Sequence, residues 1–181
     1  MHIRKPQLEE LPSLTKLWFS LGAAVLIGAV LATTVILPAE QGIDPTGIGK
    51  RLHLTRMGLL KVAMAEEEAP AEGRPSRQDQ LRIDIPAGQG QEIKMEMQKG
   101  FSADYKWTVE GGAVYQDTHG DIYADESVYI SYSVDKSKSA DEGTIEAPFG
   151  GHHGWYWKNE GDRPVTITLN TTGEYLQIMA K

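Results

Sequence analysis

The feature that most constrains this chain is an uncharged apolar run near its beginning, LWFSLGAAVLIGAVLATTVIL, which covers residues 17–37. A helix rises about 1.5 Å per residue, so the run reaches about 30 Å, the thickness of a bilayer's hydrocarbon core. Its hydroxyl residues, Ser20, Thr33 and Thr34, are able to return hydrogen bonds to the helix's own carbonyls. The run therefore predicts one transmembrane helix, with Trp18 at the headgroup level.

A cleaved secretory signal is the alternative interpretation of this run. The apolar region of such a signal usually spans about 7 to 15 residues, and a small-x-small cleavage site follows it closely. Here Leu37-Pro38-Ala39 places a bulky residue where a small one is needed, and Ala63-Met64-Ala65 lies far beyond the run. We therefore expect an uncleaved signal-anchor in a single-pass protein.

The charges beside the helix barely distinguish its two orientations. The basic residues closest to it, three on each side, are Arg4, Lys5 and Lys16 before it and Lys50, Arg51 and Arg56 after it. A long following domain translocates largely regardless of charge. We expect residues 1–16 to form a cytoplasmic tail and the C-terminal domain to lie on the other side of the membrane.

Residues 38–65 predict a juxtamembrane elbow with two short amphipathic helices. Pro38 should end the transmembrane helix, and Asp44-Pro45 reads as a cap followed by proline at the first helical position, so a helix should begin at Pro45. A second should run from Thr55 to about Ala65. The alternative is a solvated elbow. The residues expected at the membrane interface are Trp18, Ile48, Leu52 and Met57.

Two further regions follow the elbow. Residues 66–80, EEEAPAEGRPSRQDQ, lack large apolar side chains and predict a disordered linker. From 81 to 181, apolar side chains recur at every second position, which is typical of half-buried strands. The clearest such segments are residues 81–85, 93–97, 105–109, 128–134 and 165–169.

Turn residues separate these segments, and no helical pattern intervenes, so the fold class is mainly β: an antiparallel β-sandwich behind one helix. His119-Gly120-Asp121 and Gly150-Gly151 read as turns between strands. The polar stretch Asp135–Gly143 should be an exposed hairpin loop or a crossover at the sandwich edge. Met95 and Met97 share the inward phase of Ile93 and are better interpreted as core residues than as copper ligands.

Composition excludes several functions. A net charge of −7 argues against a nucleic-acid partner, which requires a surplus of basic residues. The chain has no cysteine, so thiolate chemistry and cysteine zinc sites are excluded. It also has no Gly-x-Ser-x-Gly elbow and no phosphate-binding glycine loop before a helix. We expect a non-enzyme without a cofactor.

Histidines provide the alternative function, a metal-binding accessory protein. His119 and Asp121 lie at one predicted turn and His152 and His153 at another, and imidazoles with a carboxylate suit zinc, copper or nickel. Adjacent His152 and His153 would face opposite sides of a strand, so one of them at most would join His119. The opposing interpretation is one histidine bonded within a turn and the others solvated.

The segment Trp155-Tyr156-Trp157 offers two interpretations. Alternation places the two tryptophans on one face of a strand and Tyr156 on the other. The tryptophan pair then closes the core, or the three aromatic side chains form a surface platform for a partner.

Three stretches resemble a known family. ILPAEQGIDPTGIGKRLHLTRMG after a single span, with KGFSADYKWTVEGGAVYQDTHGD and PFGGHHGWYWKNEGDRPVTITL, resembles the bacterial transmembrane anchor proteins, a poorly characterised group. The last stretch is also distantly similar to the GOLD-type sandwiches of p24 cargo proteins: Gly154, Tyr156 and Asn159 match their pattern in part, without their cysteine.

The resemblance implies an architecture more than an activity: a Gram-negative inner-membrane protein whose domain faces the periplasm, and, from the GOLD likeness, a protein-binding module. The leading hypothesis is therefore a non-catalytic, membrane-anchored periplasmic β-sandwich that binds or stabilises a partner protein, for example a membrane transporter.

Overall fold

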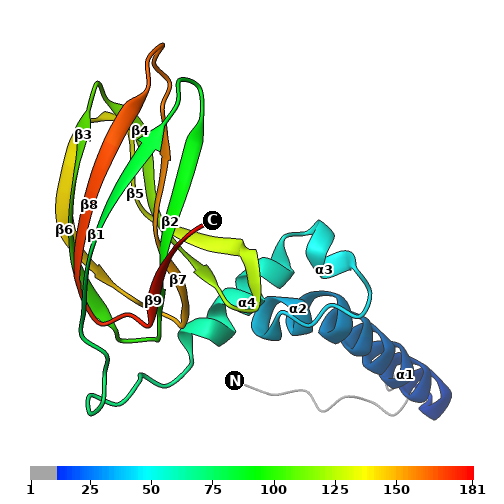
Figure 1. Cartoon of the computed structure of the whole chain (residues 1–181). Coiled ribbons are helices and arrows are strands. Elements are labelled where there is room, and N and C mark those ends of the chain that lie inside the picture. The colour runs from blue at the N-terminus through cyan, green and yellow to red at the C-terminus, as the bar shows by residue number, and fades with distance from the viewer. Residues whose placement is uncertain (1–11) are drawn as a thin grey trace, which may run out of the picture. The chain divides into compact units, whose positions relative to one another are not determined.

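The computed structural model describes residues 12–181 and divides the chain into two compact units, with the boundary between Gly58 and Leu59 (Figure 1). Residues 1–11 of the predicted cytoplasmic tail lie outside the described part of the chain.

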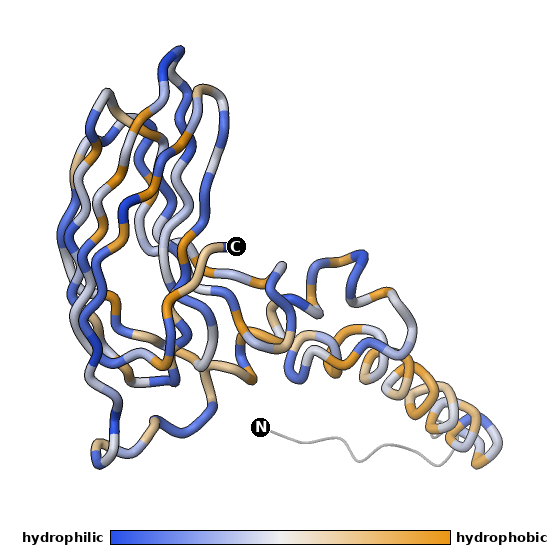
Figure 2. Tube along the Cα trace, in the orientation of Figure 1, coloured by the Kyte–Doolittle hydropathy of each residue, from blue (hydrophilic) through white to orange (hydrophobic). Residues whose placement is uncertain are grey.

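The first unit begins with a continuous helical run, Leu14–Gln41, long and apolar enough to cross a membrane. It consists of α1 (Leu14–Leu31), the π-helical turn η2 (Ala32–Ile36) and α2 (Leu37–Gln41). Apolar residues dominate α1 along its length (Figure 2). The predicted return of hydroxyls to the helix is confirmed, because Ser20 donates to Leu17 O at 2.9 Å and Thr34 to Val30 O at 2.7 Å.

Pro38 was expected to end this helix, but the helix continues to Gln41. Proline lacks an N–H and its ring collides with the carbonyl four residues earlier in a regular α-helix. The wider π turn η2 lies directly before Pro38 and relieves that collision, with the N–H of Leu37 bonded to Ala32 O. The helix ends instead at Gly42, which adopts the left-handed conformation at φ 69°.

The elbow holds two more helices, α3 (Ile48–Arg51) and α4 (Leu54–Met64). The helix predicted from Thr55 to about Ala65 is confirmed within one residue as α4. The other predicted helix, α3, begins three residues after the expected start at Pro45. Asp44 instead accepts a hydrogen bond from the N–H of Lys50 at 2.7 Å and so closes a loop. The elbow is packed: a Cβ at Gly58 would lie 2.1 Å from Pro38 O.

The second unit contains nine strands in two antiparallel sheets (Figure 1). The four-stranded sheet has the order β1 (Arg77–Ile85), β8 (Val165–Gly173), β3 (Ser102–Glu110), β6 (Ala140–Glu146). The five-stranded sheet has the order β5 (Asp125–Lys138), β4 (Val114–Ile122), β7 (Gly151–Lys158), β2 (Gly90–Met97), β9 (Gln177–Ala180). The predicted antiparallel β-sandwich is confirmed, and all five predicted strand segments lie within strands.

The core of the sandwich is formed by alternate residues of both sheets. Met95 and Met97 are fully buried in it, as their phase predicted. Trp107 of β3 meets Trp157 of β7 edge to face, with ring centroids 5.8 Å apart. Aromatic contacts of this kind join the two sheets.

The stretch Asp135–Gly143 forms a crossover between the two sheets, which was one of the two alternatives predicted from the sequence. It is not a loop. β5 continues to Lys138 and β6 begins at Ala140, so the chain passes from one sheet to the other at Ser139. Polar residues suit this position because β5 and β6 are edge strands with exposed side chains. Asp141 is held by Tyr105 and Lys138 at 3.1 and 2.7 Å.

The predicted disordered linker, residues 66–80, is held against the sandwich. Its last four residues, 77–80, belong to β1. The N–H of Ala69 donates to Lys99 O, and the guanidinium of Arg74 bonds Ala69 O, Gly100 O and the carboxylate of Glu174. Composition did not reveal this order because backbone carbonyls and one arginine provide it in place of apolar burial.

Candidate functional site

The outer face of the five-stranded sheet, opposite the core, carries a cluster of charged side chains around a glycine. In the register of the sheet, Gly154 of the central strand β7 lies between Lys94 of β2 and His119 of β4. Glycine has no side chain, so the two flanking side chains are able to approach each other above it. Lys94 is fully buried and His119 almost so.

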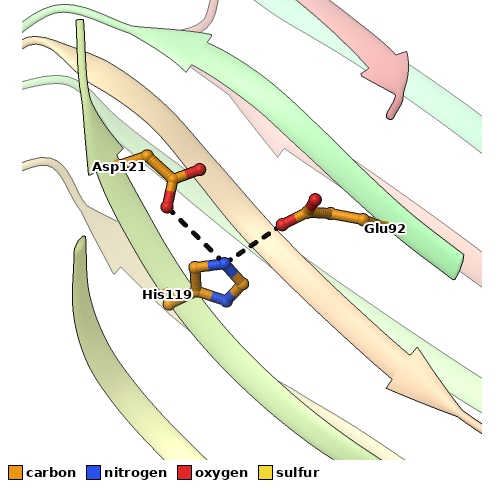
Figure 3. A group of neighbouring side chains, drawn as sticks. All are labelled: Glu92, His119 and Asp121. Atoms are coloured by element: carbon orange, nitrogen blue, oxygen red, sulfur yellow. Dashed lines mark ion pairs between the residues drawn. The ribbon is translucent and has the colours of Figure 1, made fainter. Parts of the chain in front are cut away.

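His119 contacts carboxylates from two strands (Figure 3). Its Nε2 lies 3.1 Å from Glu92 Oε1 and 3.6 Å from Asp121 Oδ1. Its Nδ1 lies 3.2 Å from the backbone O of Asp117, an acceptor, so this nitrogen carries a hydrogen. Burial is the largest influence and lowers the pKa of His119, but the hydrogen bonds to Glu92 and to the backbone of Asp117 and the charge of Asp121 together outweigh it, so the pKa is raised.

Lys94 is the counter-ion at the centre of the cluster. Its Nζ lies 3.0 Å from Asp121 Oδ2, 3.3 Å from Glu92 Oε1 and 3.4 Å from the backbone O of His119. A buried ammonium requires such partners, because the cost of removing it from water is several kcal/mol. The hydrogen bond from His119 and the charge of Lys94 lower the pKa of Glu92 to about 2. We call Glu92, Lys94, Asp117, His119 and Asp121 the outer-face cluster.

His153 lies on the inner face of the same sheet and in a different environment. Its Nε2 donates to the backbone O of Phe149 at 3.1 Å, and its Nδ1 accepts from the hydroxyl of Tyr132 at 2.7 Å. Burial lowers its pKa to about 4. The neutral imidazole therefore has both nitrogens occupied.

His152 faces the outer side but is bonded elsewhere. Its Nδ1 lies 3.3 Å from Lys181 Nζ and 3.5 Å from Glu126 Oε1, and its ring contacts Tyr123. Among residues 12–181, the histidine and carboxylate atoms that lie within 4.8 Å of one another as a possible metal-binding group belong to Glu92, His119 and Asp121. Of the four predicted ligands, the structure thus brings His119 and Asp121 together and places His152 and His153 outside the group.

Two features of this site were not expected from the sequence. His119-Gly120-Asp121 lies within the second half of β4 and is not a turn. Gly120 is required by packing, because a Cβ there would lie 2.3 Å from both His153 Nδ1 and the Tyr132 hydroxyl. Glu92 was also missed, although the alternation that buries Ile93 and Met95 places residues 92, 94 and 96 together on the other face.

The aromatic platform predicted at residues 155–157 does not form. Trp155 and Trp157 are fully buried and stacked, with ring centroids 5.9 Å apart, so they have no surface to offer a partner. Tyr156 lies on the opposite face, half-buried against Tyr115. The core interpretation of the tryptophan pair is the correct one.

The residues predicted at the membrane interface all belong to the first unit and are exposed. Trp18 is on α1, Ile48 on α3, Leu52 at its end and Met57 on α4. They are available to contact lipid.

Comparison with known proteins assigns no family. No family model and no curated protein matches the chain. A solved Klebsiella pneumoniae protein, described as an uncharacterized conserved protein with a double-stranded β-helix domain, matches with 15% identity and a TM-score of 0.33, over 65% of this chain and 92% of that one. PliG of Aeromonas hydrophila, a periplasmic inhibitor of g-type lysozyme, matches with 11% identity and a TM-score of 0.33, over 59% and 92%. Likenesses this remote assign no activity.

Proposed function

We propose that this protein is a non-catalytic, membrane-anchored β-sandwich that binds a partner protein at the periplasmic side of a bacterial inner membrane. The observation that carries the anchor is the helix Leu14–Gln41, whose most apolar window has no residue buried within the protein. An apolar surface of this length is stable in lipid and costly in water. The resemblance to transmembrane anchor proteins supports the same assignment.

The orientation rests on two arguments. The residues after the helix form a folded domain of more than 100 residues, and a domain of that size translocates largely regardless of the flanking charges. The resemblance also implies a periplasmic domain. The N-terminus is then cytoplasmic and the sandwich periplasmic.

The edge strand β5 is the surface best suited to a partner. Among residues 77–181, four of the five large apolar or aromatic side chains that are exposed lie on this strand and the turn before it, at Tyr123, Tyr129, Tyr132 and Val134, and the fifth is Leu176. Tyrosine is enriched at protein interfaces because a large apolar ring carries a polar end. β4 is the one strand that pairs with β5 in the described chain, so the other edge of β5 presents backbone groups to an added strand.

The partner is therefore a membrane protein, a transporter being one example, with an extended periplasmic segment that pairs with β5. The membrane anchor supports this choice, because it limits the search for a partner to the membrane surface.

Site-specific photo-crosslinking in cells tests this proposal. A photoreactive residue at Tyr129 or Val134 should crosslink to an integral membrane protein, whereas the same residue at Arg82 of β1 or Lys106 of β3, on the other sheet, should not. Fractionation and protease treatment of spheroplasts test the topology in parallel. Equal crosslinking at all four positions, or none at any, would contradict the partner surface, and release of the protein by alkaline carbonate would contradict the anchor.

A further inference from the structure

The donor atoms of Glu92, His119 and Asp121 are spaced like the ligands of a small metal ion. Ligand atoms about 2.0 to 2.1 Å from a zinc ion at tetrahedral angles lie about 3.4 Å apart. The distances from His119 Nε2 to Glu92 Oε1 and Asp121 Oδ1, 3.1 and 3.6 Å, lie on either side of that value. The three donor atoms all lie within 4.8 Å of one another, which is close enough for one ion to bridge them after local adjustment of the side chains.

Two of the three ligands are already oriented by neighbours. The hydrogen on His119 Nδ1 is held by the backbone O of Asp117, which points Nε2 toward the carboxylates, and a metal ion would take the place of the hydrogen that Nε2 shares with Glu92. Asp121 is held through Oδ2 by Lys94, which leaves Oδ1 to face His119. Metal-binding histidines and carboxylates in proteins are fixed by such outer hydrogen bonds.

The charge of the outer-face cluster also favours a divalent cation. Its three carboxylates, Glu92, Asp117 and Asp121, are opposed by the ammonium of Lys94, so a neutral imidazole leaves two negative charges in a largely buried site. One oxygen of Asp117, Oδ1, is buried without a hydrogen-bond partner. A divalent ion bound by His119 balances these charges.

The side chain of Glu92 provides the route for an ion. It is 28% exposed, whereas those of Asp121 and His119 are 7% and 11% exposed. An ion therefore reaches Glu92 first and then the two more buried ligands. Water completes the coordination on the same open side.

We propose that Glu92, His119 and Asp121 form a binding site for one divalent transition-metal ion of the zinc, nickel and copper(II) class. One imidazole and two carboxylates suit these ions, whereas calcium and magnesium prefer all-oxygen sites and copper(I) prefers sulfur. The site is independent of the proposed anchor and partner, so neither proposal fails with the other.

Calorimetric titration of the full chain in mild detergent with Zn²⁺ alone, repeated with Ni²⁺, tests the site. The wild type should bind one ion, and His119→Ala and Glu92→Gln should each weaken binding at least about tenfold. His152→Ala and Glu96→Gln are matched controls, because they remove the same groups from the same face outside the site, and both should bind like the wild type. Circular dichroism without metal establishes that each variant is folded.

A second measurement keeps the test decisive if His119→Ala does not fold. Zinc added to the wild type should shift the NMR resonance of His119 Nε2 and leave those of the His153 ring unchanged. The absence of binding, loss of binding in the control variants, or undiminished binding in Glu92→Gln would overturn the proposal.

Discussion

The two faces of the five-stranded sheet place His119 and His153 in environments that shift the pKa of the imidazole in opposite directions. In the register of β4 and β7, His119 lies opposite Gly154 on the outer face, and His153 lies opposite Gly120 on the inner face. Each imidazole thus occupies the space above a glycine of the neighbouring strand. The first is surrounded by carboxylates and its pKa is raised, whereas the pKa of the second is lowered to about 4.

This difference shows that the neighbours of a histidine, and not its place in the chain, decide its chemistry. The inner histidine uses both nitrogens in neutral hydrogen bonds and serves the fold. The outer histidine faces two negative oxygens, which favour its protonated form and would also favour a cation at the proposed metal site. The two faces should therefore respond differently to substitution and to pH.

The largest loss of stability should come from a substitution on the inner face. Trp155→Ala removes a fully buried ring that stacks on Trp157 and meets Tyr105 at 5.1 Å, so we expect a loss of about 3 to 5 kcal/mol in the free energy of unfolding. Tyr156→Ala, one residue away on the outer face, should cost about 1 kcal/mol. Urea unfolding followed by far-UV circular dichroism measures both, and similar losses would contradict the assignment of faces.

The next largest loss of stability should come from Lys94→Met, a substitution on the outer face. It leaves Asp121 and Glu92 without their buried counter-ion, and breaking such a pair costs about 3 kcal/mol or more. The control is Lys106→Met, which breaks the exposed pair between Lys106 and Glu142, where the expected loss is below about 1 kcal/mol. The same unfolding experiment compares them. A loss for Lys94→Met as small as the control would mean that water reaches the cluster.

Lowering the pH should reduce the stability of the fold through His153, the histidine on the inner face. The pKa of His153 is about 4 in the folded protein and about 6.5 when unfolded, so only the unfolded chain takes up a proton between these values. Stability is complete above pH 6.5 and falls as the pH is lowered toward 4, by about 2 kcal/mol at pH 5. Unfolding free energies measured from pH 7 to 5 should show this loss, and His153→Gln should lack this contribution. An identical pH dependence in the variant would remove His153 as its source.

Much of the fold was predictable because the alternation of apolar residues is strong where one face of a strand is buried. Ile93, Met95 and Met97 show this pattern, and β2 has the predicted phase. β4 was missed because its sequence, VYQDTHGDI, carries polar residues on both faces, and Gly120 suggested a turn. The glycine in fact makes room for a histidine of another strand, which no local pattern reveals.

The candidate site was predictable only in part for the same reason. His119 and Asp121 lie two residues apart, and a strand places such residues on one face. Glu92 joins them from β2, across β7, so its contribution depends on the strand order of the sheet. The opposite facing of His152 and His153 was predictable from their adjacency, but not which of them would face inward.

The smallest predicted effect concerns the hydroxyl that binds the inner histidine. Tyr132→Phe removes the donor to His153 Nδ1 and leaves a buried acceptor unpaired, so the free energy of unfolding should fall by about 1 kcal/mol. The lost bond stabilised the neutral imidazole, so the pKa of His153 should also rise, which an NMR titration of its ring would show. Tyr123→Phe is the matched control: its hydroxyl bonds Glu96 at 3.3 Å in an exposed position, where water replaces it, and the loss should be below about 0.5 kcal/mol. If Tyr132→Phe left both the stability and the pKa unchanged, the hydroxyl would not determine the state of the inner histidine, and burial alone would have to keep it neutral.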